Sequence, residues 1–208
     1  MLDTPRISPE STQDSLTLKS GSLGKGKAVS DVLGFTRDTR DSLEHLFNVA
    51  LAKAVKAEMK QKCIQCELID WPNLKNDTEI SQVVNHVNSK SPKLLLSIHG
   101  NAAGTGDWKN LDAKATGTVV LYYKTSTKGK KIATDIANNV KNCRLRFGGP
   151  DNRASHTAES SVAVLKKTNC PAVLVEACFY DNLEDLYWTV THMDKLASAI
   201  VGGIINYI

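Results

Sequence analysis

The sequence predicts a single α/β domain, in which helices cover both faces of a mainly parallel, twisted sheet. Two observations carry this prediction. Short apolar runs alternate along the chain with longer segments whose apolar residues recur every three or four positions, which is typical of strand-helix-strand units. In addition, the runs at 93–98 and 172–175 are almost entirely apolar, as expected of strands that are covered on both faces. A length of 208 residues fits one such domain.

The first 40 residues differ in character from the rest. They are rich in Ser, Thr, Gly, Lys and Asp and show little periodicity, which predicts an irregular or poorly ordered arm ahead of a domain at 41–208. Within this arm, residues 15–19 alternate between polar and apolar, which favours a short strand.

Four helices are expected, at 41–62, 76–89, 128–140 and 193–208. Asp41 or Ser42 can cap the first, and Asn76 or Asp77 the second. The inward positions are Leu43, Leu46, Phe47, Ala50, Leu51, Ala54 and Val55; Ile80, Val83, Val84 and Val87; Ile132, Ala133, Ile136 and Val140; and Met193, Leu196, Ala197, Ile200, Val201 and Ile204. Each set follows helical spacing, so each helix has one apolar face.

Four strands are expected, at 63–69, 93–98, 117–123 and 172–175. A polar loop at 99–116 separates the second from the third. The third is β-branched and aromatic, and strand alternation requires either Tyr122 or Tyr123 to face the core.

Composition excludes several classes of protein. Hydrophobic content of 41% and charged content of 23% are ordinary for a globular chain. The net charge of +4 suits an anionic polymer but is too mild to indicate one. No run reaches the length of a membrane span, and the N-terminus lacks the apolar region of a signal peptide. Five irregularly spaced cysteines argue against a disulfide framework, and we interpret Cys63 and Cys66 as ordinary strand cysteines in a reducing compartment.

Two segments each end an apolar run in a residue able to do chemistry. They are Leu94-Leu95-Leu96-Ser97-Ile98-His99-Gly100-Asn101-Ala102 and Pro171-Ala172-Val173-Leu174-Val175-Glu176-Ala177-Cys178-Phe179-Tyr180-Asp181-Asn182. In open α/β sheets, ligands bind beyond the carboxyl ends of the strands, so we expect His99 and Glu176 to meet. A neutral imidazole is a good zinc ligand, and a carboxylate ending a buried strand is costly unless paired, metal-bound or functional. A hydrogen-bonded His and a salt-bridged Glu of purely structural role are the alternatives.

These segments resemble the zinc-dependent N-acetylmuramoyl-L-alanine amidases, whose motifs are Ser-Ile-His-x-Asn-Ala and Pro-Ala-Val-Leu-Val-Glu-x-x-Phe. The resemblance covers residues 41–208. It implies that zinc-activated water hydrolyses the amide between N-acetylmuramic acid and L-alanine in peptidoglycan, with His99 as a zinc ligand. Glu176 is then the catalytic group that activates the water and passes its proton to the leaving nitrogen.

Further site residues follow from the same resemblance. Glu44, with Asn48 four residues later on the same helix face, matches the family's second zinc ligand and a residue that orients it. The alternative is that Glu44 only favours the positive end of the helix dipole. Asn101 and Arg153 match positions that bind substrate, although a solvated loop Arg is an equal interpretation of Arg153.

The third zinc ligand has no obvious counterpart. In the family it is a His in a Gly-His-Gly turn ahead of the Glu-bearing helix, and this sequence has no His before His45. One alignment matches residues 3–9 to a segment that follows this turn in phage-type relatives, so that the first strand and its His lie before residue 1. Another takes 15–20 as the first strand and 21–24 as the turn, which supplies no imidazole.

Two histidines are candidates to replace that ligand. His156 ends the loop at 151–156, which the family places near the cleft. His45 adjoins Glu44, but consecutive helical residues point about 100° apart. The expected metal ligands are therefore Glu44, His99 and His156, for Zn²⁺.

Because one ligand lacks a counterpart, a non-catalytic amidase-like protein that binds peptidoglycan or has a structural role is the main alternative function. A zinc peptidase of related chemistry is another. We expect peptidoglycan as the partner, no nucleic acid or membrane, and a monomer. The protein is expected to be made in the cytoplasm and to act on the cell wall, as an endolysin, an autolysin or a virion component.

Overall fold

The sheet of the protein has the strand order β1-β4-β2-β3. The computed structural model describes residue 29 and residues 31–33, 43–69, 77–104, 111 and 113–208. Its strands are β1 (Leu95–Asn101), β2 (Val119–Tyr123), β3 (His156–Ser160) and β4 (Ala172–Phe179). β1 pairs with β4 and β2 with β3 in parallel, whereas β2 runs antiparallel to β4. The prediction of a mainly parallel α/β sheet is therefore confirmed, with one antiparallel junction at its centre.

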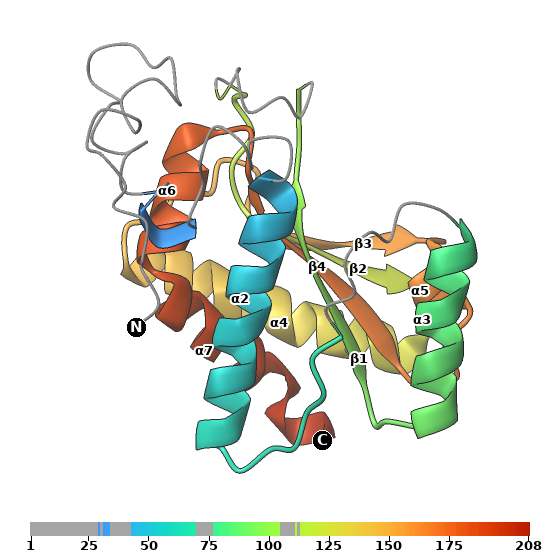
Figure 1. Ribbon diagram of the computed structural model, residues 1–208. Helices are drawn as coiled ribbons and strands as arrows, with labels where there is room; N and C mark the ends of the chain where they lie inside the picture. The colour runs from blue at the N-terminus through green and yellow to red at the C-terminus, as the bar shows by residue number, and fades with distance from the viewer. Residues whose placement is uncertain (1–28, 30, 34–42, 70–76, 105–110, 112) are drawn as a thin grey trace, which may run out of the picture.

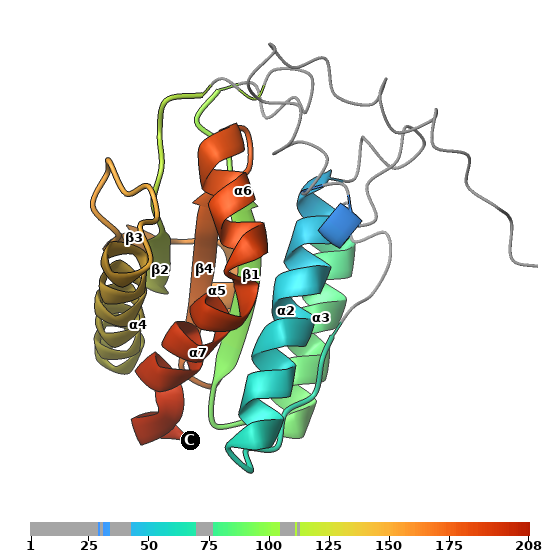
Figure 2. The same ribbon diagram turned by 90° about the vertical axis from the view of Figure 1, so that its left-hand side faces the viewer.

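Helices cover both faces of this sheet. They are α2 (Leu43–Gln61), α3 (Asp77–Lys90), α4 (Thr127–Arg146), α5 (Ala163–Lys166), α6 (Leu183–Thr191) and α7 (Met193–Ile204), followed by the short 3₁₀ helix η3 (Ile205–Tyr207). α4, α7 and α2 lie side by side over one face, whereas α3 and α5 lie over the other (Figures 1 and 2). α6 packs where β4 ends.

The main core lies between the sheet and the layer of α2, α4 and α7. Strand alternation sends Tyr122 into this core and Tyr123 to a smaller cluster under α5, as the period of two requires. Of the arm predicted at 1–40, Val29 and residues 31–33 are helical, and Val29 and Leu33 are buried in the main core. The remainder of that arm, including the strand expected at 15–19, lies outside the described residues.

The prediction of a strand at 63–69 is wrong. After α2 the chain reverses at Cys63, whose φ is 58°, and the Ile64 amide donates to the Met59 carbonyl at 2.9 Å. Residues 64–68 alternate between half-buried and exposed, but residues 64–69 do not form a strand. A strand needs a neighbour for its backbone groups, and among the described strands β1 pairs only with β4. Cys63 and Cys66 are free thiols but not strand cysteines.

Several elements are longer than the sequence predicts, and others were not predicted. β1 and β4 continue past the predicted ends at 98 and 175, so His99 and Glu176 lie inside strands. β3 begins at His156, the last residue of the loop predicted at 151–156. Its polar sequence suits a strand at the edge of the sheet, beside β2. α6 begins at the Asn182 cap, whose side chain accepts from the Asp185 amide. No described helix is long and apolar enough to span a membrane.

The contact between α7 and α4 allows a first test of the fold. A Cβ atom at Gly203 would lie 2.6 Å from the Ile136 Cα and 2.7 Å from its nitrogen. Because backbone atoms cannot move aside locally, Gly203→Ala should force the helices apart and lower the free energy of unfolding by about 1–3 kcal/mol. Urea unfolding measures this.

Gly202→Ala is the matched control for that test. Its Cβ meets only the end of the Asn139 side chain, at 3.1 Å from Nδ2, and Ala is favoured over Gly in helices. Gly202→Ala should therefore be neutral or stabilising. Equal effects of the two substitutions would contradict the close packing of α4 against α7.

Candidate active site

His99 and Glu176 are direct neighbours across β1 and β4. The two residues are Cα partners in the parallel ladder, and cross-strand partners project from the same face of a sheet. The register then shifts between His99 and Asn101, which marks an irregularity at the end of the strand. The sequence prediction that these two residues meet is confirmed by this register.

Glu44 joins them from α2. It lies in the first turn of that helix, and its Oε1 is 3.4 Å from Nδ1 of His99. Asn48 donates to the same Glu44 oxygen at 3.4 Å, as the i, i+4 spacing predicts. The other ring nitrogen of His99 lies 3.1 Å from the Ser97 hydroxyl. The hydrogen bond to His99 is the main reason why the pKa of Glu44 is lowered.

Glu176 has an unusual environment for a carboxylate. Its Oε2 atom is buried and has no hydrogen-bond partner. Burial raises its pKa to about 7; His99 opposes this shift and the charge of Glu44 adds to it. A carboxyl group with a pKa near neutrality can both accept and donate a proton at physiological pH, which is the requirement for general acid–base chemistry.

The donors near His99 match part of a zinc site. One imidazole and one carboxylate approach each other closely, and both are ordinary zinc ligands. An orphaned carboxylate oxygen of Glu176 stands on the adjacent strand. Among the described residues, however, no group of three or more His, Cys, Asp or Glu side chains could hold a metal ion. The described part of the chain thus brings together two side chains of the types that bind zinc.

The structure does not bring His156 to these donors. His156 begins β3, and Val119 of β2 is the ladder partner of both His156 and Glu176. At about 4.8 Å per strand, His156 is roughly 14 Å from His99 across the sheet. Its exposed ring instead contacts the Ala154 carbonyl at 3.1 Å through Nδ1. His45 is also exposed.

The two expected substrate residues lie at the same end of the sheet as Glu176. Asn101 pairs with Phe179 at the end of β1, and its side-chain oxygen accepts from the Ala102 amide at 2.8 Å. Arg153 is exposed, and its guanidinium carbon is 5.8 Å from the centroid of the Phe179 ring.

Two residues that the sequence did not single out, Tyr180 and Asp181, directly follow the motif that contains Glu176. Tyr180 packs so closely that a Cβ atom at Gly100 would lie 3.0 Å from its ring. The pKa of Tyr180 is raised, first by burial and then by Glu44 and other acidic neighbours. Asp181 is buried, and its Oδ2 accepts from the amides of Ala103 and Gly104 at 2.9 and 2.7 Å. Both positions adjoin the motif, which was the available signal.

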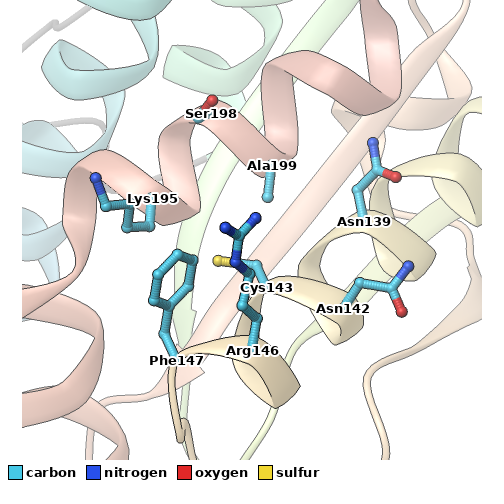
Figure 3. A pocket seen from close by; sticks show the side chains of 8 residues that line it. All are labelled: Asn139, Asn142, Cys143, Arg146, Phe147, Lys195, Ser198 and Ala199. Carbon is cyan, nitrogen blue, oxygen red and sulfur yellow. The ribbon is translucent and has the colours of Figure 1, made fainter.

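Two other features do not belong to this site. Cys178 is fully buried, and burial raises the pKa of its thiol well above the usual value, so it packs in the core and is not a nucleophile. A hollow of about 470 Å³ lies between α4 and α7 (Figure 3). Its lining is Asn139, Asn142, Cys143, Arg146, Phe147, Lys195, Ser198 and Ala199, which includes none of the site residues above.

Comparison with known families decides the identity of the chain. A family model described as N-acetylmuramoyl-L-alanine amidase matches residues 23–206. The chain belongs to the N-acetylmuramoyl-L-alanine amidase family. The resemblance drawn from the two motifs is therefore confirmed, and the function of the protein is that of a peptidoglycan amidase; the non-catalytic alternative is not favoured.

Solved structures agree with this family assignment. No curated protein matches this chain. The catalytic domain of the CD27L endolysin targeting Clostridia difficile is 26% identical, with a TM-score of 0.65 over 78% of this chain and 83% of that one. An N-acetylmuramoyl-L-alanine amidase from Clostridium difficile 630 is 24% identical, with a TM-score of 0.60 over 76% and 81%. The catalytic domain of the amidase CwlV from Bacillus (Paenibacillus) polymyxa var. colistinus is 22% identical, with a TM-score of 0.57 over 79% and 84%. The last two likenesses concern the fold alone.

Proposed function

We propose that this amidase cleaves the bond between N-acetylmuramic acid and L-alanine by zinc-dependent hydrolysis, with Glu176 as the general base and acid. The observation that carries the proposal is the buried, unpartnered Glu176 oxygen on the strand next to the Glu44–His99 pair. An ionisable group left without a partner is expensive in a purely structural setting and is typical of a catalytic one.

Glu44 and His99 are the residues that would hold zinc. When bound, zinc supplies Lewis-acid polarisation of the scissile carbonyl and makes water more acidic at the site. Asn48 orients the Glu44 carboxylate through its hydrogen bond, and Ser97 contacts the remaining ring nitrogen of His99. Such outer contacts fix the direction in which a ligand presents its donor atom. The third ligand of the proposed site is not among the described neighbours of this pair.

Glu176 moves the proton in the proposed reaction. Its carboxylate removes a proton from the attacking water and returns it to the amide nitrogen as that nitrogen leaves. Burial raises the pKa of this carboxyl to about 7, so it can take up a proton and release it again at neutral pH. Asn101 and Arg153 bind substrate carbonyl and carboxylate groups at the same end of the sheet, where an Arg fork suits a carboxylate.

Peptidoglycan is the proposed partner in this scheme. The protein acts on the cell wall as a monomer, with neither nucleic acid nor membrane as a partner. The mild net charge of +4 is compatible with binding to an anionic wall, but it is too small to be the main determinant of that binding.

Digestion of purified peptidoglycan tests the reaction. Stoichiometric zinc in the purified protein, together with new L-alanine amino termini and free lactyl carboxyl groups, is the expected result, and a chelator should abolish both product signals. New amino termini within the stem peptide alone would indicate a zinc peptidase instead. A protein with neither zinc nor released products would contradict the proposal.

A further inference from the structure

A buried ion pair lies beside the end of the strand that carries Glu176. Arg144, near the C-terminal end of α4, and Asp185, in the first turn of α6, have no exposed side-chain surface. Arg144 Nη1 donates to Asp185 Oδ1 at 2.6 Å, and the guanidinium also lies over the Trp188 ring, with 4.8 Å between its carbon and the ring centroid. The mechanism proposed above does not use this pair.

Both members of the pair hold the backbone directly after Glu176. Arg144 Nη2 donates to the Ala177 carbonyl at 2.8 Å, and Asp185 Oδ2 accepts from the Phe179 amide at 2.9 Å. On the β2 side, the ladder of β4 reaches only as far as Glu176. The Thr118 hydroxyl, just before β2, also donates to the Ala177 carbonyl, at 2.7 Å. Beyond the last ladder pair, side chains therefore hold the backbone of β4: Arg144 and Thr118 hold the Ala177 carbonyl, and Asp185 holds the Phe179 amide.

The same pair also holds the segments that lead into this region. Asp185 Oδ2 accepts from the Gly117 amide at 3.0 Å. Arg144 donates to the Thr118 hydroxyl at 3.2 Å and to the Pro150 carbonyl at 2.7 Å. Every contact of the Asp185 oxygens is to a donor, so the geometry requires its ionised form. A guanidinium offers several donors in a fixed plane, which a Lys ammonium does not.

Stability alone is a poor explanation for such a pair. Removing two charges from water costs free energy, and apolar residues of similar volume often replace a buried ion pair without loss of stability. Apolar residues cannot make directional hydrogen bonds to the carbonyl of Ala177 and the amide of Phe179. The pair therefore fixes the orientation of the backbone at the end of β4. Such orientation matters for catalysis, because a displacement of about 1 Å at a reacting group costs roughly 100-fold in rate.

We propose that Arg144 and Asp185 are positioning residues for the amidase reaction, which set where the Glu176 carboxylate stands relative to the Glu44–His99 pair. This inference rests on the proposed role of Glu176. Neither residue touches the substrate, so their effect is on the rate of the chemical step and not on substrate or metal binding.

Arg144→Lys is the principal test. Lys keeps a positive charge beside Asp185 but cannot reach the acceptors of the guanidinium together. With a soluble muropeptide substrate, kcat should fall by about tenfold or more, while KM and zinc content stay close to those of the wild type. Ile200→Val, a change to a buried residue of α7, is the control for general loosening of the core and should leave kcat unchanged.

A second variant keeps the inference testable if Arg144→Lys does not fold. The double substitution Arg144→Met with Asp185→Leu removes both charges and leaves no unpaired one. It should lower kcat in the same way, and amide hydrogen exchange of Phe179 should become faster than in the wild type.

The outcomes separate this inference from the proposed function. A wild type that lacks amidase activity overturns the proposed function and the inference with it. An active wild type whose Arg144→Lys and double variants fold and retain full kcat overturns the inference alone. A fall in kcat that Ile200→Val matches also overturns it, because the effect is then one of core packing.

Discussion

Replacing Glu176 with Gln is expected to abolish amidase activity while the fold and any bound zinc are retained. Gln has nearly the same shape but cannot accept or release the proton of the attacking water, and loss of a general acid–base group costs about 10²–10⁴-fold in rate. The proposed ligands Glu44 and His99 are unchanged, so zinc content should equal that of the wild type. Release of L-alanine amino termini from purified walls measures the loss.

The same substitution should also change how stability depends on pH. The pKa of Glu176 is raised from 4.5 to about 7 in the folded protein, so between these values the unfolded chain loses its proton first. The metal-free wild type therefore loses stability as pH rises through this range, and the loss persists above it. Glu176→Gln removes this loss and should be more stable than the wild type at pH 8 by roughly 1–3 kcal/mol, but not at pH 4.

Urea unfolding with a chelator present tests this pH dependence, because bound metal would stabilise the folded state separately. Glu159→Gln changes an exposed carboxylate on β3 and is the matched control. Its activity and the pH dependence of its stability should equal those of the wild type. Lysis at the wild-type rate by Glu176→Gln would refute the assignment of Glu176. If Glu176→Gln and the wild type differed in stability by the same amount at pH 4 and pH 8, the explanation from the raised pKa of the buried Glu176 carboxyl would be refuted.

Replacing His99 with Ala is expected to remove zinc from the protein. His99 is one of two donors that the described structure places together, and a catalytic zinc site normally needs three protein ligands. Loss of one of them should leave Glu44 unable to retain the ion during purification. Zinc content measured by mass spectrometry, together with activity, reports the result.

His156→Ala is the matched control for this experiment. Its imidazole is exposed on β3, across the sheet from His99, so its removal should leave zinc bound. The reverse pattern, in which His99→Ala retains zinc and His156→Ala loses it, would show that the ligand assignment from β1 is wrong.

The class of fold and the group of candidate site residues could be predicted from the sequence alone. Periodicity of apolar residues is a local property, so α2, α3, α4 and α7 could be predicted from it. The unbroken apolar runs likewise identified β1 and β4. Glu44, Asn48, His99 and Glu176 were predicted because each lies in a short motif, and the structure places them together.

The other features could not be predicted from sequence, because they depend on contacts between distant segments of the chain. Residues 64–69 have the composition of a strand, but ladder hydrogen bonds need a partner that no local pattern reveals. The polar β3 is a strand only because β2 lies beside it. The register of His99 with Glu176 brings two motifs to one place. Arg144 and Asp185 have no sequence pattern that joins them, and their role follows from a buried contact across 41 positions of the chain.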